Sequence, residues 1–383
     1  MNQLPPATMI TSTASLVAHV DRWAGESLLA IDTESNSLHA YHEQVCLIQV
    51  STRQADFIID PLRIENLDAL GRLLADPAIE IVFHAAEYDI MCLKRDFGFS
   101  FARLFDTMLA ARICGVKRLG LASMLEEHFG IQANKKYQRA NWGERPLTPE
   151  MLQYAQLDTH FLPQLHDYWQ ARLVQEGRWE EASESFARLC DIPPAQSEFD
   201  PEGYWRLNGA FTLPPRQIAA LRELYLWREE TARQRDCPPF KIMSDKTLLE
   251  LAQSDAQRLQ DLHGVSGMTD GQVRRYGPVI LATIRRSQKK EPPRRPPAPP
   301  RPSDMVVARF EALHDWRKAR AQQRGVESDV IISRDALWAL ARLAPRTVAE
   351  MAQIPELGAF KSQVYGEEIL QVLARVGQGN GRS

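Results

Sequence analysis

Apolar runs separated by short polar breaks fill the first third of the chain and predict a β-sheet. The runs that fit strands lie at Ser27–Ile31, Val45–Ser51, Asp56–Asp60, 79–84 and 104–106. The first three follow one another too closely for helices between them, so we expect an antiparallel meander. Around the last two runs, apolar residues recur every three or four positions, as on one face of a helix. This pattern predicts an α/β domain over residues 1–200, with a mixed sheet flanked by helices.

Beyond residue 210 the apolar residues keep helical spacing, and the sequence repeats itself at one fixed offset. Trp227, Arg228 and Tyr276 of the first copy match Trp316, Arg317 and Tyr365 of the second, among other identities. So many identities at one offset predict two small all-α domains, at 210–287 and 304–377. Between them, seven of the twelve residues of Glu291–Pro302 are proline, so we expect residues 288–303 to form a stiff, extended linker.

Charge is distributed unevenly over a composition that is otherwise ordinary for a globular protein. Of the 383 residues, 44% are hydrophobic and 25% are charged, and the net charge is −3. Residues 1–210 carry 18 basic and 29 acidic side chains, whereas residues 211–383 carry 28 and 20. An acidic half that is suited to cations is thus joined to a basic half that is suited to a polyanion.

Neither a membrane anchor nor a secretory pattern is visible in the sequence. No window approaches the roughly 20 apolar residues that a membrane-spanning helix needs. The first residues lack the basic and apolar stretches of a signal peptide. The five cysteines are scattered, with no Cys-x-x-Cys pair, and indicate neither a disulfide framework nor a zinc site. We expect a cytoplasmic protein without a membrane partner, and a monomer.

Asp32 and Glu34 are the first candidates for chemistry, because they end an apolar run and stand two residues apart. On a strand such residues point to the same side. Neighbouring carboxylates repel each other and their pKa values rise, unless an oxygen-seeking divalent cation lies between them. For an isolated pair, a solvated acidic turn is the better interpretation, so further acids are needed to favour a metal site.

Three later residues can complete such a site. Asp89 stands in the first turn of a helix expected over Ala85–Phe97. Thr148 predicts the start of another helix, on which Tyr154 and Asp158 are four residues apart and share a face. Four carboxylates can hold the two cations that hydrolyse a phosphodiester, and a tyrosine beside them can orient the attacking water.

Other polar residues leave two interpretations open. Residues 134–146 interleave lysine and arginine with Tyr137 and Trp142, which fits nucleic-acid contact or a surface loop pinned by Trp142. Asp106 fits a further acid of the site or the cap of the next helix. For His84 we favour a hydrogen-bonded histidine at a strand end over a residue of the site.

Taken together, these motifs resemble the DEDD exonuclease superfamily in its tyrosine-containing branch. The matching pattern is Asp32-x-Glu34 on a first strand, Asp89 after a strand-to-helix turn, and Tyr154-x-x-x-Asp158 on a late helix. The two helical repeats resemble HRDC domains. Over nearly the whole chain, this combination is similar to the ribonuclease D family. One departure is Ala85, because many members of that family carry asparagine at this position.

The resemblance implies a ribonuclease H-like fold and the hydrolytic removal of nucleotides from RNA 3′ ends as 5′-mononucleotides. It implies two divalent ions, Mg²⁺ or Mn²⁺, with precursor tRNA as the leading substrate. The implied metal ligands are Asp32, Glu34, Asp89 and Asp158, and Tyr154 is the fifth catalytic residue. Two alternatives remain. One is a 3′–5′ exonuclease that acts on DNA, because the same acids cleave either polymer. The other is an RNA-binding adaptor without catalytic activity.

Overall fold

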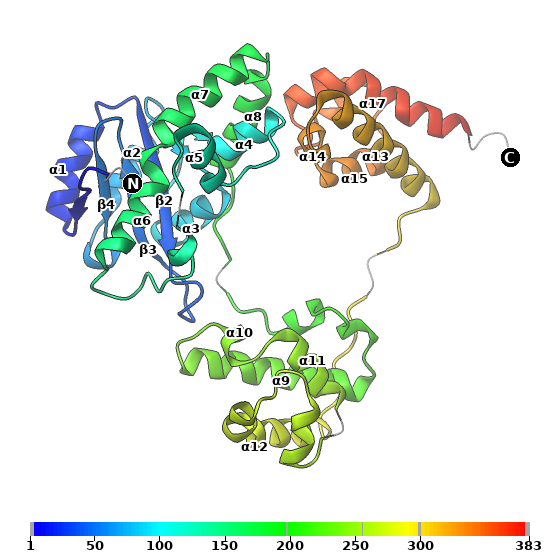
Figure 1. Cartoon of the computed structure of the whole chain (residues 1–383). Coiled ribbons are helices and arrows are strands. Elements are labelled where there is room, and N and C mark those ends of the chain that lie inside the picture. Colours follow the sequence, from blue (N-terminus) through cyan, green and yellow to red (C-terminus); the bar gives the residue numbers. More distant parts are fainter. Residues whose placement is uncertain (1–3, 133, 197, 255, 298–299, 380–383) are drawn as a thin grey trace.

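The computed structural model of the chain describes residues 4–132, 134–196, 198–254, 256–297 and 300–379. Figure 1 shows a sheet with helices on both sides, formed by the first half of the chain, and two separate groups of helices formed by the second half. Ala298 and Pro299 of the predicted linker lie outside the described ranges, as do Met1 to Gln3. Among the helices described, none has the length and apolar character needed to cross a bilayer.

Six strands form one mixed sheet in the order β1-β4-β3-β2-β5-β6. Their bounds are β1 (Thr8–Ile10), β2 (Leu28–Ser35), β3 (Val45–Ser51), β4 (Asp56–Ile59), β5 (Glu80–Phe83) and β6 (Leu104–Asp106). The pairs β2–β3 and β3–β4 are antiparallel, which confirms the predicted meander. The pairs β2–β5 and β5–β6 are parallel, and β1 adds a parallel edge that the sequence pattern did not predict.

Helices cover both faces of this sheet. They are α1 (Thr13–Trp23), α2 (Asp68–Leu74), α3 (Glu87–Phe97), α4 (Thr107–Ile113), α5 (Leu121–Phe129), α6 (Pro149–His160), α7 (Leu162–Gln175) and α8 (Trp179–Cys190). Successive residues of β2 alternate between two cores. Leu29 and Ile31 pack with α1, α2 and α3, whereas Leu28 and Ala30 pack with α4, α7 and α8. The α/β prediction is thereby confirmed, and all five cysteines are free.

The second half of the chain contains two groups of helices in matching order, in which the short 3₁₀ helix Leu259–Gly264 of the first group takes the place of α16 in the second. The first group has α9 (Pro215–Gln234), α10 (Pro239–Ile242), α11 (Asp245–Gln253) and α12 (Asp270–Ser287), and the second has α13 (Asp304–Arg324), α14 (Ser328–Ile331), α15 (Arg334–Leu343), α16 (Val348–Met351) and α17 (Ala359–Gly379). Equivalent arginines make equivalent bonds. Arg228 donates to the carbonyl of Met243 at 2.9 Å, and Arg317 donates to that of Ile332 at 3.1 Å. The predicted internal repeat is therefore a structural repeat.

The two groups of helices contact the sheet-containing part differently. In the second group, Arg324 lies 2.7 Å from the buried carboxylate of Glu181 on α8. The first group meets the loop between β2 and β3, where the amide of Tyr41 donates to Asp236 at 3.1 Å and its hydroxyl donates to Glu229 at 2.5 Å. One contact thus involves a buried charge, whereas the other is polar and partly exposed.

Candidate active site

The side chains of Asp32 and Glu34 extend from β2 on the face of the sheet that α6 covers. Asp32 lies opposite Gln49 of β3, and Glu34 lies opposite Leu47. Leu47 belongs to the same hydrophobic cluster as Ala155 of α6, so the acids that share its face also point toward that helix. The prediction that both carboxylates lie on one side of the strand is confirmed.

The helix α6 brings Asp158 to this face. Its start is fixed as the sequence predicts, because the side chain of Thr148 accepts a backbone hydrogen bond from the first turn and proline follows it. Carboxylate oxygens of Asp32, Glu34 and Asp158 lie within 4.8 Å of one another. A strand and a helix far apart in the sequence therefore present three acids to one point.

Asp89 lies beside this group of three. Its carboxylate accepts a hydrogen bond from the hydroxyl of Thr33, the residue between the two acids of β2. The negative charge of Asp89 also raises the pKa of Asp32 and of Asp158, after the larger effect of burial. The structure thus brings together all four predicted acids. Thr33 was missed, although its position between Asp32 and Glu34 could have indicated it.

Burial and mutual repulsion oppose the ionisation of these acids. Burial, followed by the charges of Asp158 and Asp89, raises the pKa of Glu34 to about 9. Burial and the charge of Asp89 raise the pKa of Asp158 to about 8, and burial raises that of Asp89 itself to about 6. The pKa of Asp32 is raised well above its ordinary value by burial and by its three acidic neighbours. A cation would relieve this repulsion.

The donors at the site fit a hard divalent cation. Carboxylate oxygens are the ligands that Mg²⁺ and Mn²⁺ prefer, and three of them already converge here. Gln49, opposite Asp32, is fully buried, and its side-chain amide has no hydrogen-bond partner among the described residues. Polar atoms that are buried in this way require a partner, and the hydration shell of a cation offers one.

Tyr154 lies beside these acids, and its phenol is protonated. Burial raises its pKa, and the charges of Asp158, Glu34 and Asp32 raise it further. Its ring centroid is 6.0 Å from those of Trp142 and of Tyr137. Because the phenol keeps its proton and its ring is packed, Tyr154 is suited to hold a polar group by hydrogen bonding.

The segment 134–146 packs as a wall of the site. Trp142 is buried, and the guanidinium of Arg145 binds the carboxylate of Asp60 at 2.7 and 2.8 Å. These two residues therefore have structural roles, as the pinned surface loop predicts. The side chain of Lys135 lies outside the described part of the chain. A cavity beside the acids is lined by Thr33, Glu34, Ser35, Ser37, Leu38, Tyr88, Asp89, Cys92, Gln138, Ala140 and Trp142.

Asp106 and His84 support the site from outside it. Asp106 caps α4 by accepting from the amides of its first turn, and it also accepts from the amides of Ala85 and Ala86 at 3.1 and 2.8 Å. His84 lies 2.9 Å from the hydroxyl of Thr107, and burial lowers its pKa. Asp106 is thus a helix cap, and His84 is the hydrogen-bonded histidine that we favoured.

Fold and site define a 3′–5′ exonuclease that carries two HRDC domains. The sequence pattern of the 3′–5′ exonuclease family matches residues 7–173, and that of the HRDC domain matches residues 217–284 and 307–373. Ribonuclease D of Pseudomonas paraeruginosa is 30% identical over 376 residues, which cover 96% of this chain and 98% of that protein. The chain belongs to the ribonuclease D family and is a 3′–5′ exoribonuclease.

Two further comparisons agree with this assignment. The crystal structure of RNase D from Escherichia coli, described as an exoribonuclease involved in structured RNA processing, has a TM-score of 0.67 and 25% identity, and the match covers 97% of this chain and 99% of that one. The exosome complex exonuclease RRP6 of Saccharomyces cerevisiae is 34% identical over 258 residues. That match covers 63% of this chain and 35% of the longer yeast protein.

Proposed function

We propose that this exoribonuclease releases 5′-mononucleotides with the help of two divalent ions, Mg²⁺ or Mn²⁺. Asp32, Glu34, Asp89 and Asp158 would hold the ions, and Tyr154 would be the fifth catalytic residue. The observation that carries the proposal is the convergence of carboxylates from β2 and α6 within 4.8 Å of one another. Cations would balance the repulsion between these half-buried acids.

Different residues of the chain have different roles at the reacting phosphodiester. When bound, the two cations would supply an activated water and stabilise the leaving 3′ oxygen. Thr33 fixes the carboxylate of Asp89 by hydrogen bonding. Tyr154, protonated and packed against Trp142, would hold the attacking water in line with the scissile bond. Each protein group therefore positions a reactant.

We further propose precursor tRNA as the substrate of a monomer that acts in the cytoplasm. The basic half of the chain supports an extended RNA, because 28 lysines and arginines stand against 20 acids beyond residue 210. We assign the catalytic domain to residues 1–200, the linker to 288–303, and the two HRDC domains to 210–287 and 304–377. The separate hydrophobic clusters of the two groups of helices support this division.

The test is digestion of a 3′-extended tRNA transcript in the presence of Mg²⁺, Mn²⁺ or EDTA. We expect stepwise shortening from the 3′ end to 5′-mononucleotides, absent with EDTA and in Asp32→Asn. The exposed Asp21→Asn on α1 is the matched control and should digest the transcript normally. Shortening that persists in EDTA, or faster digestion of a DNA of the same sequence, would contradict the proposal.

A further inference from the structure

Tyr88 is an exposed aromatic residue at the edge of the catalytic acids. It directly precedes Asp89 in the first turn of α3, and it lines the cavity that also contains Glu34. The residue is 52% exposed, whereas Cys92 and Trp142, which line the same cavity, are buried. None of the steps described above uses this side chain.

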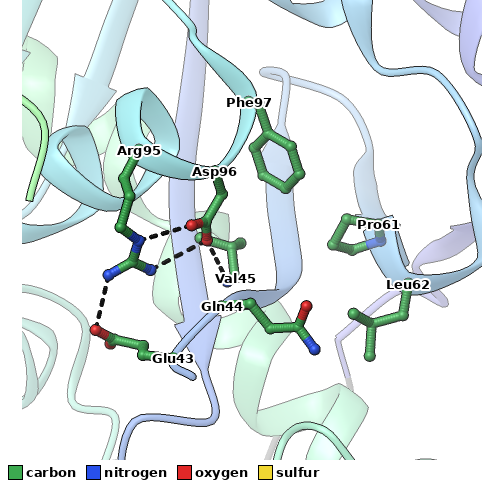
Figure 2. Close-up of a pocket in the computed structure, with 8 residues that line it drawn as sticks. All are labelled: Glu43, Gln44, Val45, Pro61, Leu62, Arg95, Asp96 and Phe97. Atoms are coloured by element: carbon green, nitrogen blue, oxygen red, sulfur yellow. Dashed lines mark hydrogen bonds and ion pairs between the residues drawn. The ribbon is translucent and has the colours of Figure 1, made fainter. Parts of the chain in front are cut away.

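The tyrosine is held by a charged network. Its hydroxyl donates to Glu43, which also accepts from the hydroxyl of Ser35 and from the guanidinium of Arg95, both at 2.9 Å. Arg95 is in turn paired with Asp96 at 2.7 Å, as Figure 2 shows. The side chains of Glu43, Arg95 and Asp96 are only 11 to 20% exposed, so the anchor itself is shielded from solvent.

This network joins Tyr88 to the strand that carries the catalytic acids. Ser35 follows Glu34 on β2, at the point where the pairing with β3 shifts register. The carboxylate of Asp96 accepts from the amide of Val45 at the start of β3. These bonds therefore hold the side chain of Tyr88 next to the strand that carries Glu34.

The anchor also fixes the direction of the tyrosine ring, because the hydroxyl donates to the carboxylate of Glu43. A tyrosine that served only for solubility would need no such anchor, whereas a fixed aromatic face is what a stacking partner needs.

The nucleobase of the substrate is the stacking partner that fits this position. Aromatic side chains beside a nuclease site bind bases through their π-faces, irrespective of base identity. The cavity that Tyr88 lines also contains Glu34 and Asp89, so a base on the ring of Tyr88 lies directly beside the acids. Since those acids hold the scissile phosphodiester in the proposed function, we assign this position to the nucleotide on the 3′ side of that bond, the terminal one.

We propose that Tyr88 is the platform on which the base of the 3′-terminal nucleotide stacks, and that Glu43 is the positioning residue that holds its ring. This inference rests on the proposed function of the carboxylate site. It adds a contact that requires a base on the terminal nucleotide, because a nucleotide without a base gains nothing from the platform.

The experiment compares Tyr88→Ala with the unmodified protein under single-turnover conditions. Three RNAs are used: an intact one, one with an abasic 3′-terminal nucleotide, and one with an abasic nucleotide next to the terminus. We expect Tyr88→Ala to remove the intact terminal nucleotide about ten- to a hundredfold more slowly. The unmodified protein should lose the same factor on the terminal abasic RNA, where the variant should lose nothing further.

Two variants separate stacking from structure. Tyr88→Phe keeps the ring but loses the bond to Glu43, so its rate should fall between those of the unmodified protein and Tyr88→Ala. Tyr168→Ala removes another exposed tyrosine, on α7, and should match the unmodified protein. The melting temperature of each variant shows whether it is folded.

Three results would overturn the proposal. They are an equal loss of Tyr88→Ala on the intact and terminal abasic RNAs, no loss on either, or a loss that follows the abasic site next to the terminus. If the unmodified protein digests none of the three RNAs, the proposed function fails, and the stacking role fails with it. Digestion of the intact RNA at equal rates by all variants removes the stacking role alone.

Discussion

Glu34 and Asp158 have pKa values of about 9 and about 8, so at neutral pH they hold protons that a divalent cation must displace. In the unfolded chain both acids would titrate near 4. Between that range and the raised values, the folded state without metal binds more protons than the unfolded state. Its stability must therefore fall as the pH rises through this window.

The expected outcome is a loss of melting temperature of several degrees between pH 5 and pH 9 in EDTA. With saturating Mg²⁺ the loss should largely disappear, because the ions stabilise the ionised carboxylates. Asp158→Asn should flatten the pH dependence in EDTA. Thermal unfolding at a series of pH values checks this, and a melting temperature that rises with pH in EDTA would contradict it.

Ala85 is the second residue whose environment leads to a prediction. It has a φ of 65°, in the left-handed region that a side chain with a Cβ rarely adopts. The amide bonds to Asp106 hold it there, directly before α3. Asparagine tolerates this conformation better than alanine.

Ala85→Asn should therefore raise the free energy of unfolding by about 0.5 to 1 kcal/mol. Urea denaturation of the protein in EDTA measures the change without a contribution from metal binding. Ala24→Asn is the control, because Ala24 has a φ of −60° and gains nothing from the substitution. Equal changes in both variants would show that backbone strain is not the cause.

At the scale of elements, the sequence predicts a structure best where local chemistry and periodicity agree. Thr148 and Pro149 start α6 as expected, and the spacing of Tyr154 and Asp158 places both on one face. The short strand β1 carries no such signal. The predicted helix at Ala85 begins instead at Glu87, because hydrogen bonds to the distant Asp106 hold Ala85 in the left-handed region. Contacts of this kind are set by tertiary packing, which local pattern does not contain.

The helix α6 is also fastened to the sheet by a buried carboxylate. The carboxylate of Asp56 on β4 accepts hydrogen bonds from the side-chain amide of Gln156 at 2.6 Å and from the hydroxyl of Ser51 at 2.7 Å. It also lies 2.8 Å from the ring of His160. Burial alone would raise the pKa of Asp56, but these hydrogen bonds outweigh it and lower the pKa. The stability that Asp56 contributes is thus present above pH 4 and is lost as the pH falls through its lowered value.

Asp56→Asn should lower the free energy of unfolding by about 2 to 4 kcal/mol at pH 7. Its effect should shrink below pH 4, because the unfolded chain there takes up a proton at Asp56 that the folded carboxylate resists. Urea denaturation at pH 7 and pH 3 checks both parts, with the exposed Asp21→Asn as control. An equal decrease in the free energy of unfolding at the two pH values would show that the packing of this side chain, and not its charge, holds α6 on the sheet.

At the scale of the whole molecule, the repeat predicts that the two HRDC domains share a fold but not where each one docks. Arg235 and Arg324 are equivalent and bind Tyr276 and Tyr365 in the same way. Only Arg324 also pairs with Glu181, which is 2% exposed. One repeat position therefore has a second role that depends on a partner elsewhere in the chain.

Removing Arg324 should release the second HRDC domain from α8. The carboxylate of Glu181 would be left buried without its cation, a change that costs about 3 to 5 kcal/mol. We expect Arg324→Gln to increase the radius of gyration in small-angle scattering, whereas Arg235→Gln, at the equivalent position, should not. Release should slow the trimming of a structured tRNA more than that of a short single-stranded RNA, because only the longer RNA reaches the displaced domain. Equal slowing of both RNAs would place the effect of Arg324 in the catalytic domain instead, through the packing of α8 on β6.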